Sequence, residues 1–471
     1  MNDIRKDYSL LINGRLVPGA STMEVINPAT GTVLAICPRA DEAQLNQAVA
    51  AAKAAFPAWS KLGIAERRAK LMTIADGIEA RLNEIAQLLT AEQGKPIADA
   101  MGEVGGSAYI LRTLAAMELP SKVLMEDAKE KVVAHRTPLG VVAAITPWNF
   151  PLSILMVKIA PALLAGNTVV AKPAPTTPLT SLLFAQIAAQ HLPAGVFNII
   201  TDQNDLGGVL TKHPDVAKVS FTGSTATGKK VMESAGSSLK RVTLELGGND
   251  AAIVLDDVDP KDIAAKLFAG AMINTGQVCL AIKRIYVHES QYDAICTELA
   301  KLAEAAVVGD GMKPGTQFGP LQNKTQFERV RELIEDTRRQ GKIIAGGKVT
   351  EGGGYFIAPT IVRDIADDAR LVREEQFGPI VPVLRYKTID DVIARVNDTN
   401  YGLGGTVWSK DPERALQVAL KVDSGIVWVN QHMNVHFDKP AGGSKQSGIG
   451  QELGIEGLHE FTQNHVVYVA K

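Results

Sequence analysis

Residues 141–172 read VVAAITPWNFPLSILMVKIAPALLAGNTVVAK, and the fold class follows from the pattern in them. Two short apolar runs, 141–145 and 168–171, have the composition of buried strands, and residues 152–164 between them favour a helix. The loop TPWNFP at 146–151 joins the first strand to the helix and is stiffened by two prolines. A strand, a helix and a second strand in this order predict a parallel βαβ unit.

The same alternation of strands and helices extends along most of the chain. After this unit we expect strands at 196–200, 216–221 and 241–246 and helices at 179–189, 206–212 and 228–235. A second run has expected strands at 251–255, 284–287, 380–386, 404–408 and 426–430 and helices at 262–272, 292–307, 324–340, 389–397 and 412–422. We therefore expect an α/β fold with two doubly wound domains that meet near Gly247.

The N-terminal part of the chain is expected to pack on this framework. Residues up to about Arg39 are strand-like, and a helix is expected to start at Asp41, with Gln44 completing a capping box. A second long helix is expected to stop at Gly94 and Pro96. Its apolar face is formed by Leu71, Ile74, Ile78, Leu82, Ile85 and Leu89.

Two segments depart from the α/β pattern. Residues 118–138 turn polar and suggest an excursion from the core, and residues 463–469 read as a strand without an internal hairpin partner. A strand with an unpaired edge offers backbone groups to another chain. We therefore expect both segments to contribute to contacts between subunits.

Length and composition exclude several classes of protein. The 471 residues suggest two or three domains, and the net charge of −2 gives no electrostatic basis for binding nucleic acid or an anionic membrane. Three widely spaced cysteines fit a reducing compartment rather than a disulfide framework. The first residues lack a signal peptide's apolar core, and Lys158, Pro161 and Gly166 interrupt the longest apolar stretch. We expect a cytoplasmic protein.

Glu245 and Cys279 are the first candidates for catalysis. Glu245 ends an apolar strand, and a carboxyl group in such a place tends to have a raised pKa, as a general base at neutral pH requires. Cys279 follows the polar, flexible run Gly276–Gln277, and a reachable thiolate is a strong nucleophile. Taken alone, a single cysteine is more often an inert core residue, and a glutamate at a strand end is more often solvated.

Four loops between the expected elements carry further candidates. Asn149 offers an amide donor suited to an oxyanion, and Lys172 follows a strand directly before prolines, where it suits ribose or phosphate. Gly223 lies between a strand and a helix N-terminus, an arrangement that binds anions although it is not a GxGxxG motif. Glu375 and Phe377 suit a ribose and a flat ring. Each loop in isolation also fits an ordinary connection or a solvated surface.

Together and in this order, the motifs TPWNFP, AKP, SFTGS, LELGG, GQVC, EEQFGP and GGSKQSG resemble the aldehyde dehydrogenase superfamily over almost the whole chain. The resemblance implies the hydrolytic type, with Cys279 as the nucleophile and Glu245 as the general base. It implies that Asn149 and the backbone N–H of Cys279 stabilise the oxyanion. Lys158 and Glu452 match a pair that relays protons from the base.

The resemblance also implies a cofactor, NAD, with NADP as the second choice. No spacing of metal ligands appears in the sequence, so we expect no metal. Where NAD-preferring members commonly have an acid three residues after the lysine, this chain has Pro175, which neither binds a 2′-hydroxyl nor repels a 2′-phosphate. The residues expected to contact the cofactor are Thr146, Pro147, Trp148, Lys172, Gly207, Phe221, Gly223, Ser224, Gln326, Glu375 and Phe377.

The substrate pocket is expected to be apolar. By family comparison it is lined by Phe150, Ile154, Val157, Val435 and Ala441. No arginine stands out to clamp a substrate carboxylate, although His432 and His436 are in the same region. We expect a medium aliphatic or aromatic aldehyde. A semialdehyde such as succinate semialdehyde remains an alternative.

Three further alternatives concern the chemistry. A CoA-acylating dehydrogenase would share the fold, and Glu245 argues against it because a hydrolytic base would destroy the thioester. Esterase activity would use Cys279 without a cofactor. A non-catalytic binding or structural protein is the remaining class, and the presence of Cys279, Glu245, Asn149 and Lys172 together argues against it.

The resemblance implies a division of the chain into three parts. Residues 1–117 and 139–247 form the expected cofactor-binding domain, residues 248–446 the catalytic domain, and residues 118–138 and 447–471 an oligomerisation segment. A homodimer or homotetramer is expected. Gln451 stands where the family usually has an arginine, so the details of its subunit contacts are not carried over.

Overall fold

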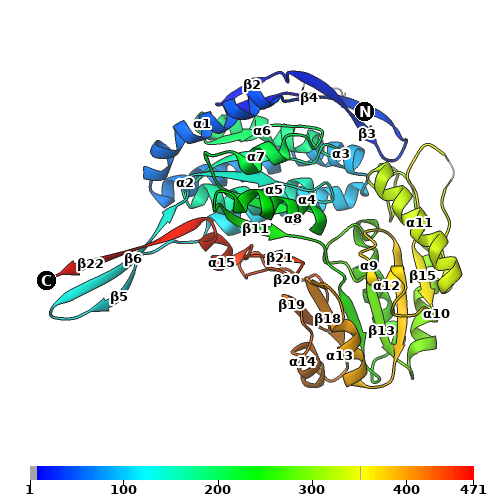
Figure 1. Cartoon of the computed structure of the whole chain (residues 1–471). Helices are drawn as coiled ribbons and strands as arrows, with labels where there is room; N and C mark the ends of the chain where they lie inside the picture. The colour runs from blue at the N-terminus through cyan, green and yellow to red at the C-terminus, as the bar shows by residue number, and fades with distance from the viewer. Residues whose placement is uncertain (1–7, 351) are drawn as a thin grey trace.

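The computed structural model describes residues 8–350 and 352–471 (Figure 1). Its first sheet has eight strands in the order β2-β1-β9-β8-β7-β10-β11-β21. The five strands from β9 to β11 are parallel, and antiparallel strands lie at both edges. The strands are β1 (Leu10–Ile12), β2 (Arg15–Val17), β7 (Val141–Ile145), β8 (Thr168–Lys172), β9 (Phe197–Ile199), β10 (Val216–Thr222), β11 (Arg241–Glu245) and β21 (Gly448–Ile449).

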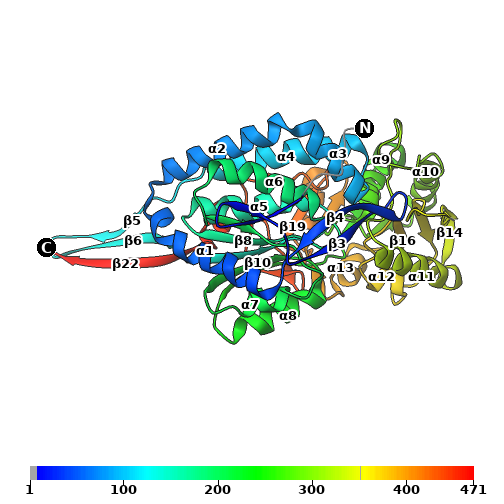
Figure 2. The same ribbon diagram turned by 90° about the horizontal axis from the view of Figure 1, so that it is seen from above.

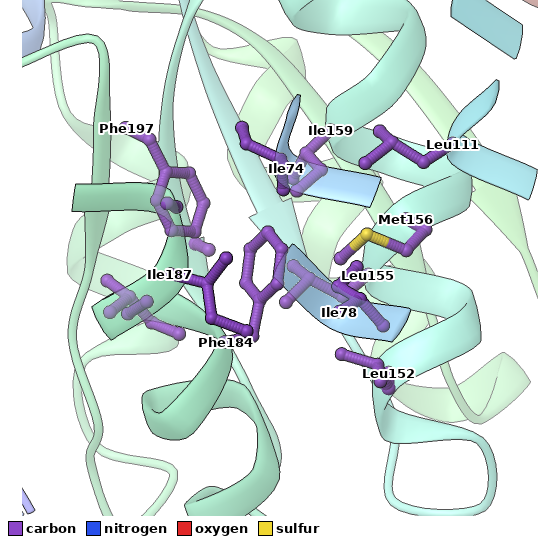
Figure 3. Packing of buried hydrophobic residues seen from close by; sticks show 14 of the residues in the cluster. Ile74, Ile78, Leu111, Leu152, Leu155, Met156, Ile159, Phe184, Ile187 and Phe197 are labelled. Carbon is purple, nitrogen blue, oxygen red and sulfur yellow. The ribbon is translucent and has the colours of Figure 1, made fainter. Parts of the chain in front are cut away.

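Helices cover both faces of this sheet. One face packs against α2 (Ile64–Ala80), α3 (Leu82–Gln93), α4 (Ile97–Ala115), α5 (Pro151–Leu164) and α6 (Leu179–His191). Figure 3 shows this core, in which Phe184 and Phe197 lie edge to face with ring centroids 5.6 Å apart. The other face packs against α1 (Glu42–Lys61), α7 (Gly207–Lys212) and α8 (Thr225–Gly236).

The second sheet has seven strands in the order β14-β15-β16-β13-β12-β18-β19. They are β12 (Ala251–Val254), β13 (Arg284–His288), β14 (Lys342–Ala345), β15 (Thr360–Arg363), β16 (Ile380–Tyr386), β18 (Gly404–Trp408) and β19 (Ile426–Val429). Apolar clusters on its two faces contain residues of α9 (Pro260–Met272), α10 (Tyr292–Glu304), α11 (Lys324–Gln340), α12 (Arg370–Arg373), α13 (Ile389–Asn397) and α14 (Pro412–Ala419). The α/β fold with two largely parallel sheets is confirmed.

A three-stranded antiparallel arm projects from the body of the molecule and ends near the C-terminus (Figures 1 and 2). It consists of β5 (Lys122–Glu126), β6 (Glu130–Pro138) and β22 (Thr462–Ala470). The expectation that the last strand has no partner within the chain is wrong, because β22 pairs with β6 along its whole length, from Thr462↔Pro138 to Ala470↔Glu130.

The N-terminal region differs from its prediction in three details. The expected second helix is two helices, α2 and α3, because the backbone leaves the helical region at Arg81 (φ −113°, ψ 18°). The helix α4 was not predicted. Asp41 caps α1 by accepting the N–H of Gln44 at 2.8 Å, but the side chain of Gln44 accepts the N–H of Ala20 instead of completing a capping box.

The remaining elements lie outside the two large sheets and the arm. They are the hairpin β3 (Ser21–Asn27) and β4 (Thr32–Arg39), the pair β17 (Tyr401–Gly402) and β20 (Ser444–Lys445), the 3₁₀ turn η1 (Ile273–Gly276) and the helix α15 (Gly454–His459). Within residues 8–350 and 352–471, no helix is long and apolar enough to cross a bilayer. In the same part of the chain, no group of at least three histidine, cysteine or acidic side chains is placed to bind a metal ion.

Candidate active site

A cavity lies where loops of the first sheet meet loops of the second. Cys279 and Asn149 line it together with residues expected to contact a cofactor. The complete lining is Pro147, Trp148, Asn149, Thr222, Gly223, Ser224, Leu246, Gly247, Cys279, Gln326, Arg329, Glu375 and Phe377. Asn149, Gly223 and Glu245 lie at or just after the carboxyl ends of strands β7, β10 and β11. This is the edge at which a parallel sheet binds its ligands.

The chain approaches Cys279 through a tight turn. Asn274, Thr275 and Gly276 have positive φ values of 49°, 57° and 72°. The turn passes so close to the loop at Gly378 that a Cβ atom on Gly276 would lie 2.2 Å from the Gly378 carbonyl oxygen. Only glycine fits at this approach, and the strained turn fixes where Cys279 enters the cavity.

The environment of Cys279 favours the protonated thiol. The residue is partly exposed, but burial among its neighbours raises the pKa of the thiol to about 12. The carboxyl groups of Glu375, Glu245 and Asp250 act in the same direction, and Lys283 opposes them. The thiol therefore has to lose its proton as it attacks, so the chemistry requires a base nearby.

Glu245 is suited to that role. Burial raises the pKa of its carboxyl group well above the usual value, the charge of Glu452 raises it further, and Lys158 opposes both. Its Oε1 atom is buried and has no hydrogen-bond partner among the described residues. A buried, unpaired carboxyl oxygen with a raised pKa can exchange a proton near neutral pH.

Lys158 and Glu452 form an ion pair next to this base. The Nζ atom of Lys158 lies 2.7 Å from Oε1 of Glu452 and donates to the hydroxyl of Ser220 at 3.3 Å. Lys158 is fully buried, whereas 12% of the Glu452 side chain is exposed. The pair therefore connects the buried surroundings of Glu245 to a group that solvent reaches.

Asn149 is held from several sides. Its Nδ2 group donates to the carbonyl of Gln277 at 2.9 Å, and its backbone carbonyl accepts from Lys95 at 3.0 Å and from Asn274 at 3.1 Å. Because an amide nitrogen carries two hydrogens, one donor of Asn149 remains for a ligand. An oriented donor beside Cys279 suits an oxyanion.

A buried ion pair that no sequence motif indicates supports the Asn149 loop. Lys95 and Glu103 are 2.5 Å apart with 1% of each side chain exposed. The other oxygen of Glu103 accepts the backbone N–H groups of Leu152 and Ser153 at the start of α5. A lysine after a glycine reads as a solvated loop residue, so only the packing identifies this pair.

The N-terminus of α8 offers an anion site. Gly223 links β10 to Ser224, whose side chain caps the helix by accepting the N–H of Thr227 at 3.2 Å. The first turn of this helix carries no acidic residue. A Cβ atom on Gly223 would lie 2.5 Å from the ring of Phe221, so a larger residue would crowd the turn. These features fit the diphosphate of a dinucleotide.

Lys172 and Gly207 do not line the cavity, and a Cβ atom on Gly207 would lie 3.6 Å from the side chain of Lys172. The Nζ atom of Lys172 is paired with Asp202 at 2.7 Å, and both side chains are buried. Asp202 was not singled out from the sequence. Thr146 likewise lies outside the cavity, and its N–H donates to the Lys172 carbonyl at 3.1 Å. The cavity therefore holds the diphosphate and nicotinamide candidates, and these residues flank it.

Glu375 and Phe377 form the opposite wall. Oε1 of Glu375 accepts the N–H of Gly248 at 3.0 Å, and a Cβ atom on Gly247 would lie 2.3 Å from its Oε2. Phe377 has a φ of 50° and packs edge to face against Trp148 at 5.3 Å. Two aromatic rings and a carboxylate fit the nicotinamide ribose end of a dinucleotide.

Helix α11 holds this wall in place. Gln326 donates to the carbonyls of Gln376 and Phe377, both at 2.9 Å, and Arg329 donates to the carbonyl of Glu375 at 2.8 Å. Gln326, which is expected to contact the cofactor, lines the cavity, and its amide also positions the loop. Arg329 also lines the cavity but belongs to no motif that the sequence analysis used.

The expected substrate residues do not line the cavity around Cys279. Ile154 and Val157 are the partly exposed apolar residues of α5, and Val157, Val435 and Ala441 pack against the core of the first sheet. The ring of Phe150 lies 3.8 Å from the ammonium of Lys95. Phe150, Ile154 and Val157 lie between Asn149 and Lys158 in the chain.

The two histidines of the same region differ. His432 is within 2.8 Å of the Leu280 carbonyl, and burial lowers its pKa to about 4. It is neutral at physiological pH and brings no positive charge towards a substrate carboxylate. His436 is exposed.

Comparison with known proteins identifies the family. Residues 16–467 match the model described as "Aldehyde dehydrogenase family". The chain is 40% identical to phenylacetaldehyde dehydrogenase of Pseudomonas fluorescens over 100% of this chain and 97% of that protein. It superposes with a TM-score of 0.97 on the NAD+ complex of an aldehyde dehydrogenase from Bacillus cereus, at 37% identity and covering 99% of this chain and 97% of that one. It also superposes with a TM-score of 0.97 on an NADP-dependent enzyme from E. coli, at 35% identity and covering 100% of this chain and 99% of that one. The chain belongs to the aldehyde dehydrogenase family.

Proposed function

We propose that this protein oxidises an aldehyde to the carboxylic acid with NAD+ as the cofactor and Cys279 as the nucleophile. The observation that carries the proposal is the cavity that contains Cys279, Asn149, Glu375 and the N-terminus of α8. The raised pKa of Glu245 supports the hydrolytic half of the reaction.

The residues act in two stages. The sulfur of Cys279 bonds to the carbonyl carbon while its proton passes to the carboxylate of Glu245, and the resulting oxyanion accepts the remaining amide N–H of Asn149 and the backbone N–H of Cys279. The bound dinucleotide supplies the acceptor for the hydride that leaves this carbon. Glu245 first releases that proton through Lys158 and Glu452 to solvent and becomes a carboxylate again. It then takes a proton from water, which attacks the thioester, and the sulfur of Cys279 leaves as a thiolate as the acid forms.

Asn149→Ala should lower kcat by about 10²–10³-fold, the range measured for loss of one oxyanion donor. The reason is that Asn149 stabilises charge that exists only after Cys279 has attacked. Steady-state kinetics with saturating cofactor measure the loss, and the KM for NAD+ should change little. A loss confined to KM would contradict the role of Asn149. Asn149→Asp is the matched variant and should be equally impaired, because a carboxylate of similar shape offers no donor.

NAD+ is the proposed cofactor, with NADP+ accepted as a second one. Related structures support both, since one is an NAD+ complex and another is an NADP-dependent enzyme. Pro175 is partly exposed and carries neither a charge nor a donor that would distinguish the two adenosine riboses.

Pro175→Glu should restrict the enzyme to NAD+. A carboxylate at this position would repel the 2′-phosphate, and kcat/KM with NADP+ should fall by at least about tenfold, which corresponds to ~1.4 kcal/mol. Pro175→Gln has the same size without the charge and is the matched control, so it should retain NADP+ use. The measurement is kcat/KM of the parent and both variants with NAD+ and with NADP+. Equal losses in the two variants would show that charge is not the cause.

A medium aliphatic or aromatic aldehyde is the proposed substrate. The residues expected from the sequence to face the substrate lie outside the cavity around Cys279, but all are uncharged: Phe150, Ile154, Val157, Val435 and Ala441. His432 is neutral, and a relative is named phenylacetaldehyde dehydrogenase. The test compares kcat/KM for octanal, benzaldehyde, phenylacetaldehyde and succinate semialdehyde by the absorbance of NADH. A strong preference for succinate semialdehyde would reject the apolar pocket.

The arm is the proposed site of subunit assembly. Its strands expose the apolar residues Val123, Leu124, Met125, Val466, Tyr468 and Val469. Exposed apolar residues on sheet edges favour pairing with another chain. Light scattering of the full chain, with a variant lacking residues 463–471 as the comparison, distinguishes a dimer or tetramer from a monomer.

A further inference from the structure

Lys283 lies immediately behind the nucleophile. Only 2% of its side chain is exposed, and it precedes strand β13 by one residue. Its ammonium donates to three backbone carbonyls of one short turn, those of Val278 at 2.8 Å, Cys279 at 2.6 Å and Ala281 at 3.2 Å. Because an ammonium has three N–H groups, all its donors are used within this turn.

The charge of Lys283 is not neutralised by direct contact with an acid. In the described part of the chain its ion-pair partner is Glu375, whose Oε1 is 3.9 Å away and already accepts the N–H of Gly248. Burial of an ammonium costs free energy that hydrogen bonds must offset. Here backbone carbonyls offset it, so the positive charge remains available to the groups around Cys279.

The three bonds fix both peptide groups that flank the nucleophile. The Val278 carbonyl belongs to the same peptide group as the N–H of Cys279, and the Cys279 carbonyl belongs to the next. Among the described residues no atom accepts the N–H of Cys279. When a carbonyl accepts a hydrogen bond from a charged group, its peptide group is polarised, and the N–H of that peptide group becomes a stronger hydrogen-bond donor. Lys283 therefore both orients and strengthens a donor that is free for an oxyanion.

The same charge acts on the sulfur. The groups that bear on the pKa of the Cys279 thiol are Lys283, Glu375, Glu245 and Asp250, besides burial. The three carboxyl groups favour the thiol, and Lys283 is the group that favours the thiolate. Asp250 is about half protonated at neutral pH, since burial raises its pKa to about 7. Loss of Lys283 would leave the carboxyl groups unopposed.

We propose that Lys283 is a positioning residue for the reaction at Cys279: by holding the peptide groups on both sides of the nucleophile, it aims the Cys279 N–H at the oxyanion and stabilises the attacking thiolate. The inference rests on the proposed oxidation of aldehydes. Lys283 contacts neither substrate nor cofactor in this scheme, and it acts through Cys279.

Lys283→Met and Lys283→Gln remove the charge and test this role. The first measurement is the rate at which iodoacetamide alkylates Cys279 as a function of pH, with the enzyme free of cofactor. Cys37 and Cys296 are buried, so Cys279 is the partly exposed thiol. We expect alkylation at neutral pH to slow by about tenfold, the change in thiolate fraction that accompanies one unit of pKa.

The second measurement separates kcat from KM. Removal of a residue that orients a catalytic group typically costs about 10–100-fold, so kcat for aldehyde oxidation should fall by that factor. The KM for NAD+ should change less than kcat, because Lys283 reaches the cofactor site only through Glu375, whose Oε1 is 3.9 Å away. Lys261→Met is the matched control, since Lys261 is exposed at the start of α9, and it should behave as the parent enzyme in both measurements.

Lys283→Arg keeps the charge but replaces the ammonium, whose three N–H groups point in different directions, with a planar guanidinium. Its alkylation profile should match that of the parent, while its kcat should remain at least about threefold lower because the guanidinium cannot reach all three carbonyls. A folded neutral variant with the parent's alkylation profile and kcat would overturn the proposal. If neither neutral variant folds, Lys283→Arg decides, and a parental kcat would then overturn it.

The two readouts keep this inference separate from the proposed function. A parent enzyme that oxidises no aldehyde would refute the proposed function, whatever Lys283 does. Alkylation of Cys279 needs neither aldehyde nor cofactor, so an unchanged pH profile in the neutral variants would refute the role of Lys283 even in an active enzyme.

Discussion

Cys279→Ala should abolish aldehyde oxidation, with kcat reduced by at least about 10⁴-fold. The loss is large because the sulfur carries the substrate through both stages, and removal of a nucleophile typically costs at least this much. Neither remaining cysteine can replace it, since Cys37 is in the core of the first sheet and Cys296 in that of the second. The measurement is steady-state NADH formation with saturating aldehyde.

Two controls show that the loss concerns chemistry and not folding. Cys296→Ala removes a buried thiol of the same kind and should keep kcat within about twofold, because a small core truncation affects stability more than turnover. Cys279→Ala should bind NAD+ as the parent does, followed by the fluorescence of Trp148 in the cavity. Turnover of one tenth or more in Cys279→Ala would exclude the proposed nucleophile.

The central part of the fold could be predicted because its strands are buried on both faces. Every residue of β7 and β8 is buried, so these strands read as continuous apolar runs whose meaning does not depend on distant parts of the chain. The boundaries of β7, β10 and α11 agree with the prediction to within about one residue, because prolines, glycines and polar caps mark them.

The parts that were missed depend on distant contacts. The helix α4 contains Gly102, Gly105 and Gly106, which weaken any local helical preference, and it forms because its apolar side packs in the core with α2 and α5. The partner of β22 could not be found locally, since β6 lies far earlier in the chain. Sequence patterns report local preference, and these elements depend on tertiary packing.

The same distinction applies to the active site. Residues of the motif loops were found because their order along the chain is diagnostic. Lys283 and Lys95 were missed because a lysine in a loop reads as solvated, and nothing local shows that each is at least 98% buried. Both turn out to bind backbone carbonyls of the catalytic loops, Lys283 that of Cys279 and Lys95 that of Asn149. Burial of a charge is visible only after the fold is known.

Glu245→Gln should separate the two halves of the reaction. Glutamine keeps the size of the side chain but cannot take a proton from water, so hydrolysis of the thioester should slow by about 10²–10⁴-fold, the range for a general base. Attack by Cys279 also loses its proton acceptor in this variant, but a thiol is a much stronger acid than water and depends less on the base. Attack and departure of the hydride should therefore be slowed less. The first turnover should then appear as a burst of NADH close to one per active site, followed by a slow steady state.

The pH dependence of the deacylation rate tests this prediction independently. Burial and the charge of Glu452 raise the pKa of the Glu245 carboxyl group, so the base form is scarce at low pH and becomes populated as pH rises through that raised pKa. The deacylation rate of the parent should therefore increase with pH. In Glu245→Gln this increase should disappear, because no group remains to titrate there.

The experiment is a stopped-flow measurement of NADH formation at several pH values, with the acyl-enzyme detected by mass spectrometry on Cys279. Glu233→Gln changes one exposed carboxylate on α8 in the same way and should show neither a burst nor an altered pH profile. Equal slowing of the burst and of the steady state in Glu245→Gln would mean that Glu245 mainly takes the proton of the thiol. The combination of a retained burst with a flat pH profile is the result expected if Glu245 activates the hydrolytic water.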